Sequence, residues 1–326
     1  MQQADLRRSE EIIDLTRPLP RVTPTTSVSL VSGSGRAGNV RRAIELVADD
    51  FEAVVKGKRR IVIEPNFVSV TKQKAATYVD AVQAVLQALR PLVGDQPITI
   101  AESRIMEGVR NYGYETLKAI ANVRFVEIDE DDEVAARIVG PEGTQVVKLA
   151  RTLVDSDCLI SVHLPKTHDA VIATLGLKNI HFTALMRSRE KHYREALHVT
   201  RGVHHKGIYE LAHLLRPHFS VVDGWTGMEG AGPVDGDPVE WGIALAGRDF
   251  LAVDVLTAAL MGFNPADIGY LRFCKEDGTL GEGDLNRIQV LGDDFNRLQR
   301  KFRPHPTYEW QLGWKEYFGL KEQPRA

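Results

Sequence analysis

Lysine and histidine gather in one stretch of this chain. Nine of the ten histidines lie between residues 163 and 218, and four lysines share that stretch. Lys166 and His168 stand out because they follow the apolar run 158–164 only two residues apart. Histidine moves protons near neutral pH, and a partly desolvated lysine can hold an anion or act as a base. The pattern is typical of proton abstraction beside a carboxylate or carbonyl, or of acyl or phosphoryl transfer. A solvated polar lid would have the same composition, so both interpretations stay open.

Other ionisable and amide groups follow the remaining apolar runs, which predict strands at 27–31, 60–66, 98–103, 123–128, 158–164, 219–224 and 241–247. Ligands of open α/β sheets bind outside the carboxyl ends of the strands, so we expect these groups to converge. The predicted catalytic residues are Lys166, His168, His181, His204 and Asp223. The predicted ligand-binding residues are Asn66, Glu102, Ser103, Lys178, Asn179, Glu229, Gly230, Gly232, Arg248 and Asp249.

Two glycine-dense segments are further candidates. Gly33, Gly35 and Gly38 fit G-x-G-x-x-G between a strand and a helix, the context in which a helix N-terminus binds pyrophosphate. Glu64 follows Gly33 by 31 positions, farther than the usual acidic residue at about 20. A plain anion-binding or tight-packing turn is the alternative. The segment 223–233 is predicted to be a long loop that faces the ligand.

The alternation of strands and helices predicts an α/β fold, with a mainly parallel sheet and helices on both faces. Helices are expected at 39–55, at 112–121 and at 249–263. Another helix is expected to begin at a capping box formed by Thr77 and Asp80 and to end near Pro91. The run 133–149 predicts a short antiparallel hairpin insertion. We expect an N-terminal arm (1–24), an α/β domain (25–292) and an aromatic C-terminal extension (293–326). The α/β domain could also consist of two lobes that divide near residues 150–160. The extension suits a packed strap or a homo-oligomer contact.

Composition excludes several classes of protein. A net charge of −3 and a pI near 6.4 argue against a general nucleic-acid surface. No window approaches the roughly 20 apolar residues of a membrane span, and the first residues lack a signal core. Two cysteines are too few for a disulfide framework or an iron–sulfur cluster, so we expect a cytoplasmic protein. No zinc signature is present, although a divalent metal held by distant segments stays open.

Several motifs occur in the order of a known family: Pro65-Asn66, Glu102-Ser103, Pro165-Lys166-x-His168, Leu177-Lys178-Asn179, Asp223-Gly224 with Glu229-Gly230-x-Gly232-Pro233, and Arg248-Asp249-x3-Val253-Asp254. Over about residues 25–285 the chain resembles domain-of-unknown-function family 362. That family usually has lysine where Glu64 stands and glycine shortly after Lys178-Asn179. Many relatives carry a ferredoxin-type cysteine cluster that is absent here, so electron transfer is not implied. Residues 14–20 are also similar to a motif of nickel-pincer lactate racemase, an α/β protein with catalytic histidines.

These observations predict an enzyme that acts on a small anionic metabolite by lysine and histidine acid–base chemistry, of the isomerase, lyase or group-transfer type. Lys166 and Lys178 would hold the anion, and His168, with His181 or His204, would move protons. Asp223 and Glu102 would orient these groups or bind a metal. The alternatives are a nucleotide-dependent oxidoreductase that uses Gly33–Gly38 and a non-catalytic ligand-binding or assembly subunit.

Overall fold

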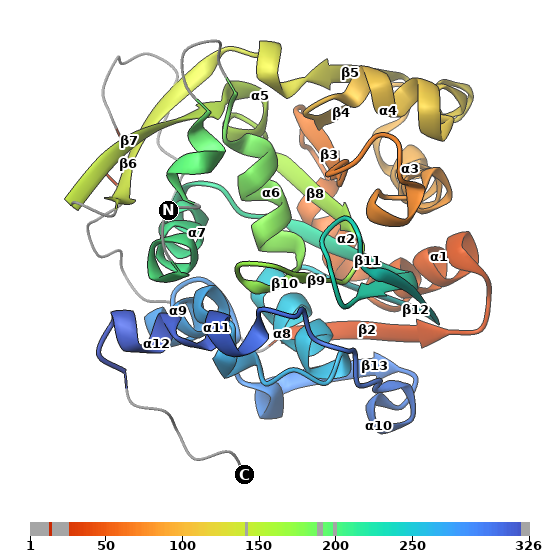
Figure 1. The fold of residues 1–326 in the computed structure, drawn as a ribbon. Coiled ribbons are helices and arrows are strands. Elements are labelled where there is room, and N and C mark those ends of the chain that lie inside the picture. Colours follow the sequence, from red (N-terminus) through yellow and green to blue (C-terminus); the bar gives the residue numbers. More distant parts are fainter. Residues whose placement is uncertain (1–12, 15–25, 141–142, 188–191, 198–200, 321–326) are drawn as a thin grey trace.

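The computed structural model describes residues 13–14, 26–140, 143–187, 192–197 and 201–320. It confirms the predicted α/β fold (Figure 1). The predicted N-terminal arm, and with it most of the segment similar to lactate racemase, lies outside the described residues except for Ile13–Asp14.

The main sheet places strands from both halves of the chain side by side. In every pair along its path the strands run parallel, except where β12 pairs antiparallel with both of its neighbours. Seven carboxyl ends therefore share one edge, and β12 ends at the opposite edge. The spatial order is β13 (Ile288–Gly292), β2 (Thr26–Ser32), β12 (Asp237–Gly247), β11 (Phe219–Glu229), β8 (Cys158–His163), β3 (Ile61–Pro65), β4 (Ile98–Glu102) and β5 (Val123–Glu127).

Helices cover both faces of this sheet, as predicted. Along β8, Ile160 and Val162 face one apolar core, while Leu159 faces another, because successive side chains of a strand point to opposite faces. Ser161 and His163 share the second face with Leu159. The first core is covered by α1 (Arg36–Leu46), α2 (Ala48–Val55) and α3 (Val79–Val93), and the second face by α6 (Gly176–Ala184), α7 (Arg201–Leu214) and α8 (Phe250–Leu260).

The predicted hairpin insertion is also confirmed. Strands β6 (Glu133–Gly140) and β7 (Gly143–Ala150) pair antiparallel, and β1 (Ile13–Asp14) adds to β6 in parallel. The remaining elements are α4 (Ile105–Tyr112), α5 (Arg151–Val154), β9 (Lys166–His168), β10 (Ile172–Thr174), α9 (Gly269–Asp277), α10 (Phe295–Leu298), α11 (Tyr308–Leu312) and α12 (Trp314–Tyr317). Short 3₁₀ turns lie at Gln73–Ala75, Tyr114–Ala119, Ile128–Glu130, Tyr193–Ala196, Pro265–Asp267 and Leu285–Arg287.

Several local predictions were wrong. The expected loop 223–233 is mostly strand, because β11 continues through a bulge to Glu229. The helix expected at 112–121 is a 3₁₀ turn, which begins after Gly113 (φ 75°) has ended α4. The helix expected at 39–55 breaks into α1 and α2 at Val47. No capping box forms, because the Thr77 hydroxyl instead accepts from the Asn66 N–H and donates to the Val162 carbonyl.

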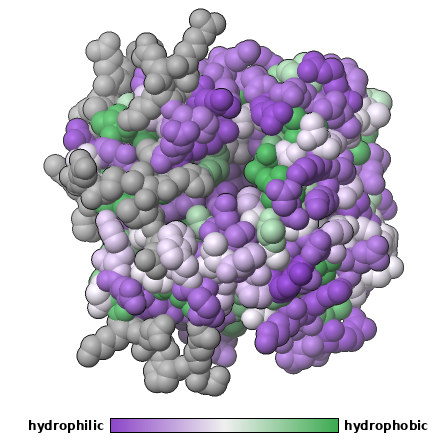
Figure 2. All heavy atoms as spheres, in the orientation of Figure 1, coloured by the Kyte–Doolittle hydropathy of each residue, from purple (hydrophilic) through white to green (hydrophobic). Residues whose placement is uncertain are grey.

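The aromatic C-terminal extension packs largely on its own chain. Trp314 is buried against the His205 ring, whereas Trp310 and Tyr317 are about half exposed. On the face drawn in Figure 2, the described surface is mostly hydrophilic with small scattered hydrophobic groups. Within the part of the chain that the structure describes, no helix has the length and apolar character needed to cross a bilayer.

Candidate functional site

A carboxylic acid lies fully buried beneath α6. Glu64 of β3 has no solvent exposure, and the Asn179 amide donates to both of its oxygens at 2.9 and 2.8 Å. The Thr183 hydroxyl donates to the same carboxyl at 2.6 Å. Asn179 and Thr183 are four residues apart and so share one face of α6. Burial nevertheless raises the pKa of Glu64 well above its ordinary value.

Lys166 joins this acid through two amides. Its Nζ is fully buried and donates to Asn66 Oδ1 and, at 2.8 Å, to the Ala75 carbonyl. The Asn66 amide in turn donates to Asn179 Oδ1. Among the described residues, no carboxylate forms an ion pair with Lys166. Burial, together with the charge of Lys178, lowers the pKa of Lys166 to about 7.

Lys178 lies between Lys166 and a cluster formed by Phe182, His204 and His168. Its Nζ lies 4.1 Å from the centre of the Phe182 ring, one helical turn along α6. That ring lies 4.9 Å from the ring of His204, which lies 6.0 Å from that of His168. Burial lowers the pKa of Lys178 to about 8. Lys178, Phe182, His204 and His168 therefore form a chain of successive contacts that links three residues predicted from separate segments.

Glu102 and Ser103 complete the same region at the end of β4. Glu102 is 3% exposed and accepts from the Phe67 N–H and the Ser103 hydroxyl, both at 3.0 Å. Thr183 lies 3.4 Å away and so touches both buried acids. Burial raises the pKa of Glu102 to about 7, although the charge of Arg194 opposes the shift. Arg194 was not predicted, because it lies in a polar stretch without a pattern.

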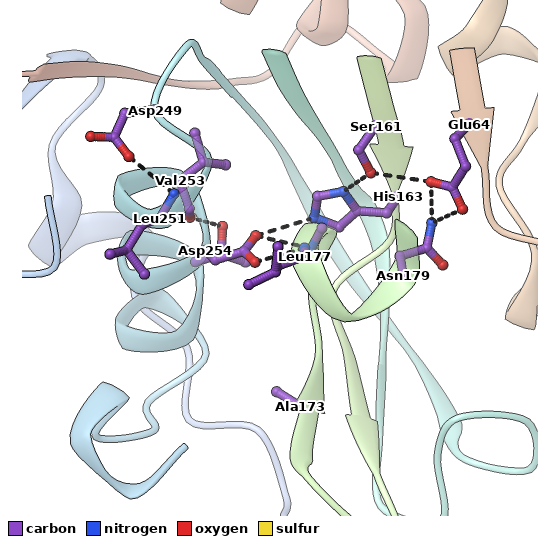
Figure 3. Close-up of polar contacts among 12 residues, drawn as sticks. Glu64, Ser161, His163, Ala173, Leu177, Asn179, Asp249, Leu251, Val253 and Asp254 are labelled. Carbon is purple, nitrogen blue, oxygen red and sulfur yellow. Dashed lines mark hydrogen bonds and ion pairs between the residues drawn. The ribbon is translucent and has the colours of Figure 1, made fainter. Parts of the chain in front are cut away.

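A second branch runs from Glu64 toward α8 (Figure 3). The Ser161 hydroxyl lies 3.4 Å from Glu64 Oε2 and 3.2 Å from His163 Nδ1. His163 Nε2 points to Asp254 Oδ1 at 3.9 Å, and Asp254 accepts the first two N–H groups of α6. Burial lowers the pKa of His163 to about 3 and raises that of Asp254 to about 7. The signals for this branch were Asp254 in the motif that ends Val253-Asp254 and the alternation of polar and apolar residues within 158–163.

A covering segment, residues 67–76, closes over Lys166 between β3 and α3. Its ends form a β-bridge between Phe67 and Ala76, and Ala75 supplies the carbonyl bound by Lys166. On its outer side Lys72 forms an ion pair with Asp235, and Lys74 donates to the Gly236 carbonyl at 2.8 Å. The turn between β11 and β12 therefore holds the covering segment in place.

Asp223 lies at the expected edge of the sheet but is engaged by Arg36. The two side chains form an ion pair at 2.9 Å, and the Arg36 guanidinium lies 3.4 Å from the centre of the Tyr78 ring. Burial raises the pKa of Asp223 to about 6, and Arg36 opposes this shift.

The glycine segment forms the expected turn between a strand and a helix. Gly33 and Gly35 have φ of 92° and 75°, and Gly38 lies in the first turn of α1. Glu64, however, lies on β3, which three strands separate from β2, and its oxygens are occupied by Asn179. Glu64 is therefore not placed to bind a ribose at this turn.

Two predicted residues lie at the wrong edge of the sheet. Arg248 and Asp249 follow β12, and because β12 is antiparallel to its neighbours it ends away from the buried lysines. Asp249 instead caps α8 by accepting from the Leu251 and Ala252 N–H groups. Strand periodicity carries no information on strand direction, so the sequence could not reveal this.

The other predicted residues hold neighbouring elements. His181 lies on another face of α6, where its Nε2 contacts the Leu215 carbonyl at 2.7 Å. Glu229 accepts from the Arg303 N–H, and the Gly230 N–H donates to the Arg303 carbonyl. Gly232 lies so close to Thr167 that a Cβ would meet its carbonyl oxygen at 2.1 Å.

The described residues contain no group of three or more histidine, cysteine or acidic side chains placed to hold a metal ion. What the site offers is a set of groups whose pKa values lie near neutral pH, namely Lys166, Lys178, Glu102 and Asp254, beside an aromatic and histidine cluster.

The model of the domain of unknown function DUF362 matches residues 61–259. A thylakoid-associated protein of Synechocystis sp. is 25% identical over 255 residues, which are 74% of this chain and 76% of that protein.

Two solved structures are more distantly similar. The lactate racemase apoprotein of Thermoanaerobacterium thermosaccharolyticum is 14% identical, with a TM-score of 0.43, over 79% of this chain and 58% of that one. A Thermotoga maritima protein is 11% identical, with a TM-score of 0.43, over 76% and 59%. The chain thus spans less than two thirds of the length of these two proteins.

Proposed function

The chain belongs to the DUF362 family, and from its buried site we propose that it is an enzyme acting on a small anionic metabolite by acid–base chemistry, of the isomerase, lyase or group-transfer type. One observation carries this proposal. Lys166, Lys178 and Glu102 lie in one region with pKa values of about 7, 8 and 7. Groups that exchange protons near the working pH make efficient general acids and bases.

The lysines also supply the preference for an anion. A buried ammonium is costly unless a negative charge accompanies it. Lys178 forms no ion pair with a carboxylate among the described residues, and its Nζ lies over the face of Phe182, so only the more distant negative charges of Asp169 and Glu64 act on it. A carboxylate of the metabolite would supply the missing charge, and His168 and His204 would lie within the same region for proton transfer.

The proposal is tested with a panel of small 2-hydroxy and 2-oxo carboxylates. Binding is measured by calorimetry, and turnover by NMR detection of deuterium entering the carbon-bound positions in D₂O. We expect at least one compound to bind and to exchange. Lys178→Met should weaken binding by about tenfold or more, whereas Lys166→Met should retain binding and lose exchange.

Lys118→Met is the matched control, because Lys118 is exposed and forms its ion pair with Glu115 at the surface. It should leave binding and exchange unchanged. Binding without exchange for every compound would favour a non-catalytic ligand-binding subunit. A complete absence of binding would overturn the proposal.

A further inference from the structure

We infer that Lys166 is a nucleophile that forms an imine with the carbonyl carbon of a small 2-oxo acid, while Lys178 holds the carboxylate of the same molecule. The inference rests on the proposed function and names its substrate class. Its starting point is the hydrogen bonding of Lys166. The described residues offer Nζ two acceptors, Asn66 Oδ1 and the Ala75 carbonyl. An ammonium has three N–H donors, whereas a neutral amine has two and keeps a lone pair.

The surroundings of Lys166 favour the neutral amine. The side chain is fully buried, and no described carboxylate forms an ion pair with it, so the charges of Glu102 and Glu64 compensate its charged form only in part. The nearby charge of Lys178 acts in the same direction and helps lower the pKa of Lys166 to about 7. Burial and a neighbouring cation are the two conditions that turn a lysine into a nucleophile at neutral pH.

Two adjacent lysines with different roles match a molecule that carries a carbonyl next to a carboxylate. Lys178 keeps the higher pKa, about 8, and so stays mostly charged at pH 7. It can hold the carboxylate, which places the 2-oxo carbon near the neutral amine. A ligand with a carboxylate but no carbonyl would use Lys178 alone and leave the neutrality of Lys166 without a role.

The reaction balances without a redox partner. The Nζ lone pair attacks the carbonyl carbon, a C–N bond forms, and the C=O π pair moves to oxygen, which takes up a proton. The nitrogen then loses a proton, and its lone pair expels the protonated hydroxyl as water. The net change is amine plus ketone giving imine plus water. Glu102, whose charge acts on Lys166 and whose pKa is raised to about 7, is suited to supply and recover the proton.

The test traps the imine. The full chain is incubated with pyruvate or glyoxylate, reduced with borohydride, and digested for mass spectrometry. We expect one reduced adduct located on Lys166. The adduct should be absent in Lys166→Met, which keeps a long unbranched side chain without a charge and has no amine to form an imine. At pH 7 it should fall by about tenfold in Lys178→Met, because the carboxylate loses its partner. Lys118→Met should label like the parent.

A second measurement keeps the test decisive if the lysine variants fail to fold. In the unmodified protein at pH 7, the reduced adduct on Lys166 should be at least about tenfold more abundant than the adduct on the exposed Lys56. As the pH is raised, the yield of the Lys166 adduct should increase most steeply near pH 7. No adduct on Lys166 with either probe at any pH would overturn the inference. If carboxylates still bind through Lys178 in that case, the proposed function survives. If binding is also absent, both fail.

Discussion

The buried position of Lys166 gives stability a distinctive dependence on pH. Its pKa is about 7 in the folded protein and near its ordinary 10.5 when the chain unfolds. Below pH 7 Lys166 is protonated in both the folded and the unfolded chain, so its contribution to the unfolding free energy does not change with pH there. In this range the folded protein carries the full cost of burying the lysine charge. Between pH 7 and 10.5 only the unfolded state keeps the proton, so stability rises with pH.

We therefore expect Lys166→Met to become more favourable relative to the parent as the pH falls. Between pH 9 and pH 6 the difference in unfolding free energy should shift toward the variant by about 3 kcal/mol. Urea unfolding at the two pH values measures this shift. A difference that stays constant with pH would mean that Lys166 is charged in the folded protein throughout this range.

Glu64 is expected to hold α6 on the sheet. Glu64→Ala leaves the buried donors of Asn179 and Thr183 without an acceptor, so we expect a loss of about 2–4 kcal/mol in unfolding free energy. Thr183→Val, which removes one donor and keeps the side-chain shape, should cost about 1 kcal/mol. Chemical denaturation compares the two variants, and equal losses would contradict the central place of Glu64.

At the scale of elements, the covering segment 67–76 must move for any ligand to reach Lys166, because Nζ is fully buried against Ala75. Asp235→Asn removes the ion pair with Lys72 and should speed severalfold both hydrogen exchange in residues 67–76 and formation of the borohydride-trapped imine on Lys166. The melting temperature should hardly change, because exposed ion pairs contribute little to stability.

Glu115→Gln is the control for this variant, because it breaks a similarly exposed pair with Lys118 far from the turn. It should leave both rates unaltered. Equal rates in Asp235→Asn and the parent would show that the β11–β12 turn does not restrain the covering segment.

The elements also show what the sequence could predict. Strands flanked by turns are readable from apolar runs, and their ends correctly grouped Asn66, Glu102 and Lys166. The sequence did not reveal the polar residues inside strands and helices that bind the site residues. Ser161 and Thr183 lie inside an apolar strand and a buried helix, and only the packing of α6 on the sheet brings them to Glu64. The buried helices α6 and α7 were hidden by their histidines, which ordinarily indicate a polar surface.

At the scale of the whole molecule, the C-terminal extension holds the end of the site that carries His168. The Gln311 side chain donates to the His168 carbonyl at 2.8 Å and accepts from the Ile172 N–H. Ile172 has φ of 69°, which is unfavourable for a β-branched residue and therefore depends on its surroundings.

Gln311→Ala should lower the free energy of unfolding by about 1–3 kcal/mol, because buried groups of the β9–β10 hairpin lose their partner. It should also broaden the NMR signals of the His168 ring. Gln299→Ala removes a similar amide bond from the same extension, to the Ala259 carbonyl, and should leave the His168 signals sharp. Unchanged His168 signals in Gln311→Ala would contradict this restraint.

The position of β2 in the sheet has a consequence for synthesis of the protein. Its two neighbours are β12 and β13, so Ser29 meets Ala246 across 217 residues of chain. A ribosome adds roughly 5–20 residues per second, and β2 therefore waits roughly 10–40 s before a partner strand exists. Through that interval the apolar edge formed by Val28, Leu30 and Val31 is open to other chains. Nascent chains of this protein should thus depend on chaperones more than chains whose first strand pairs with the second.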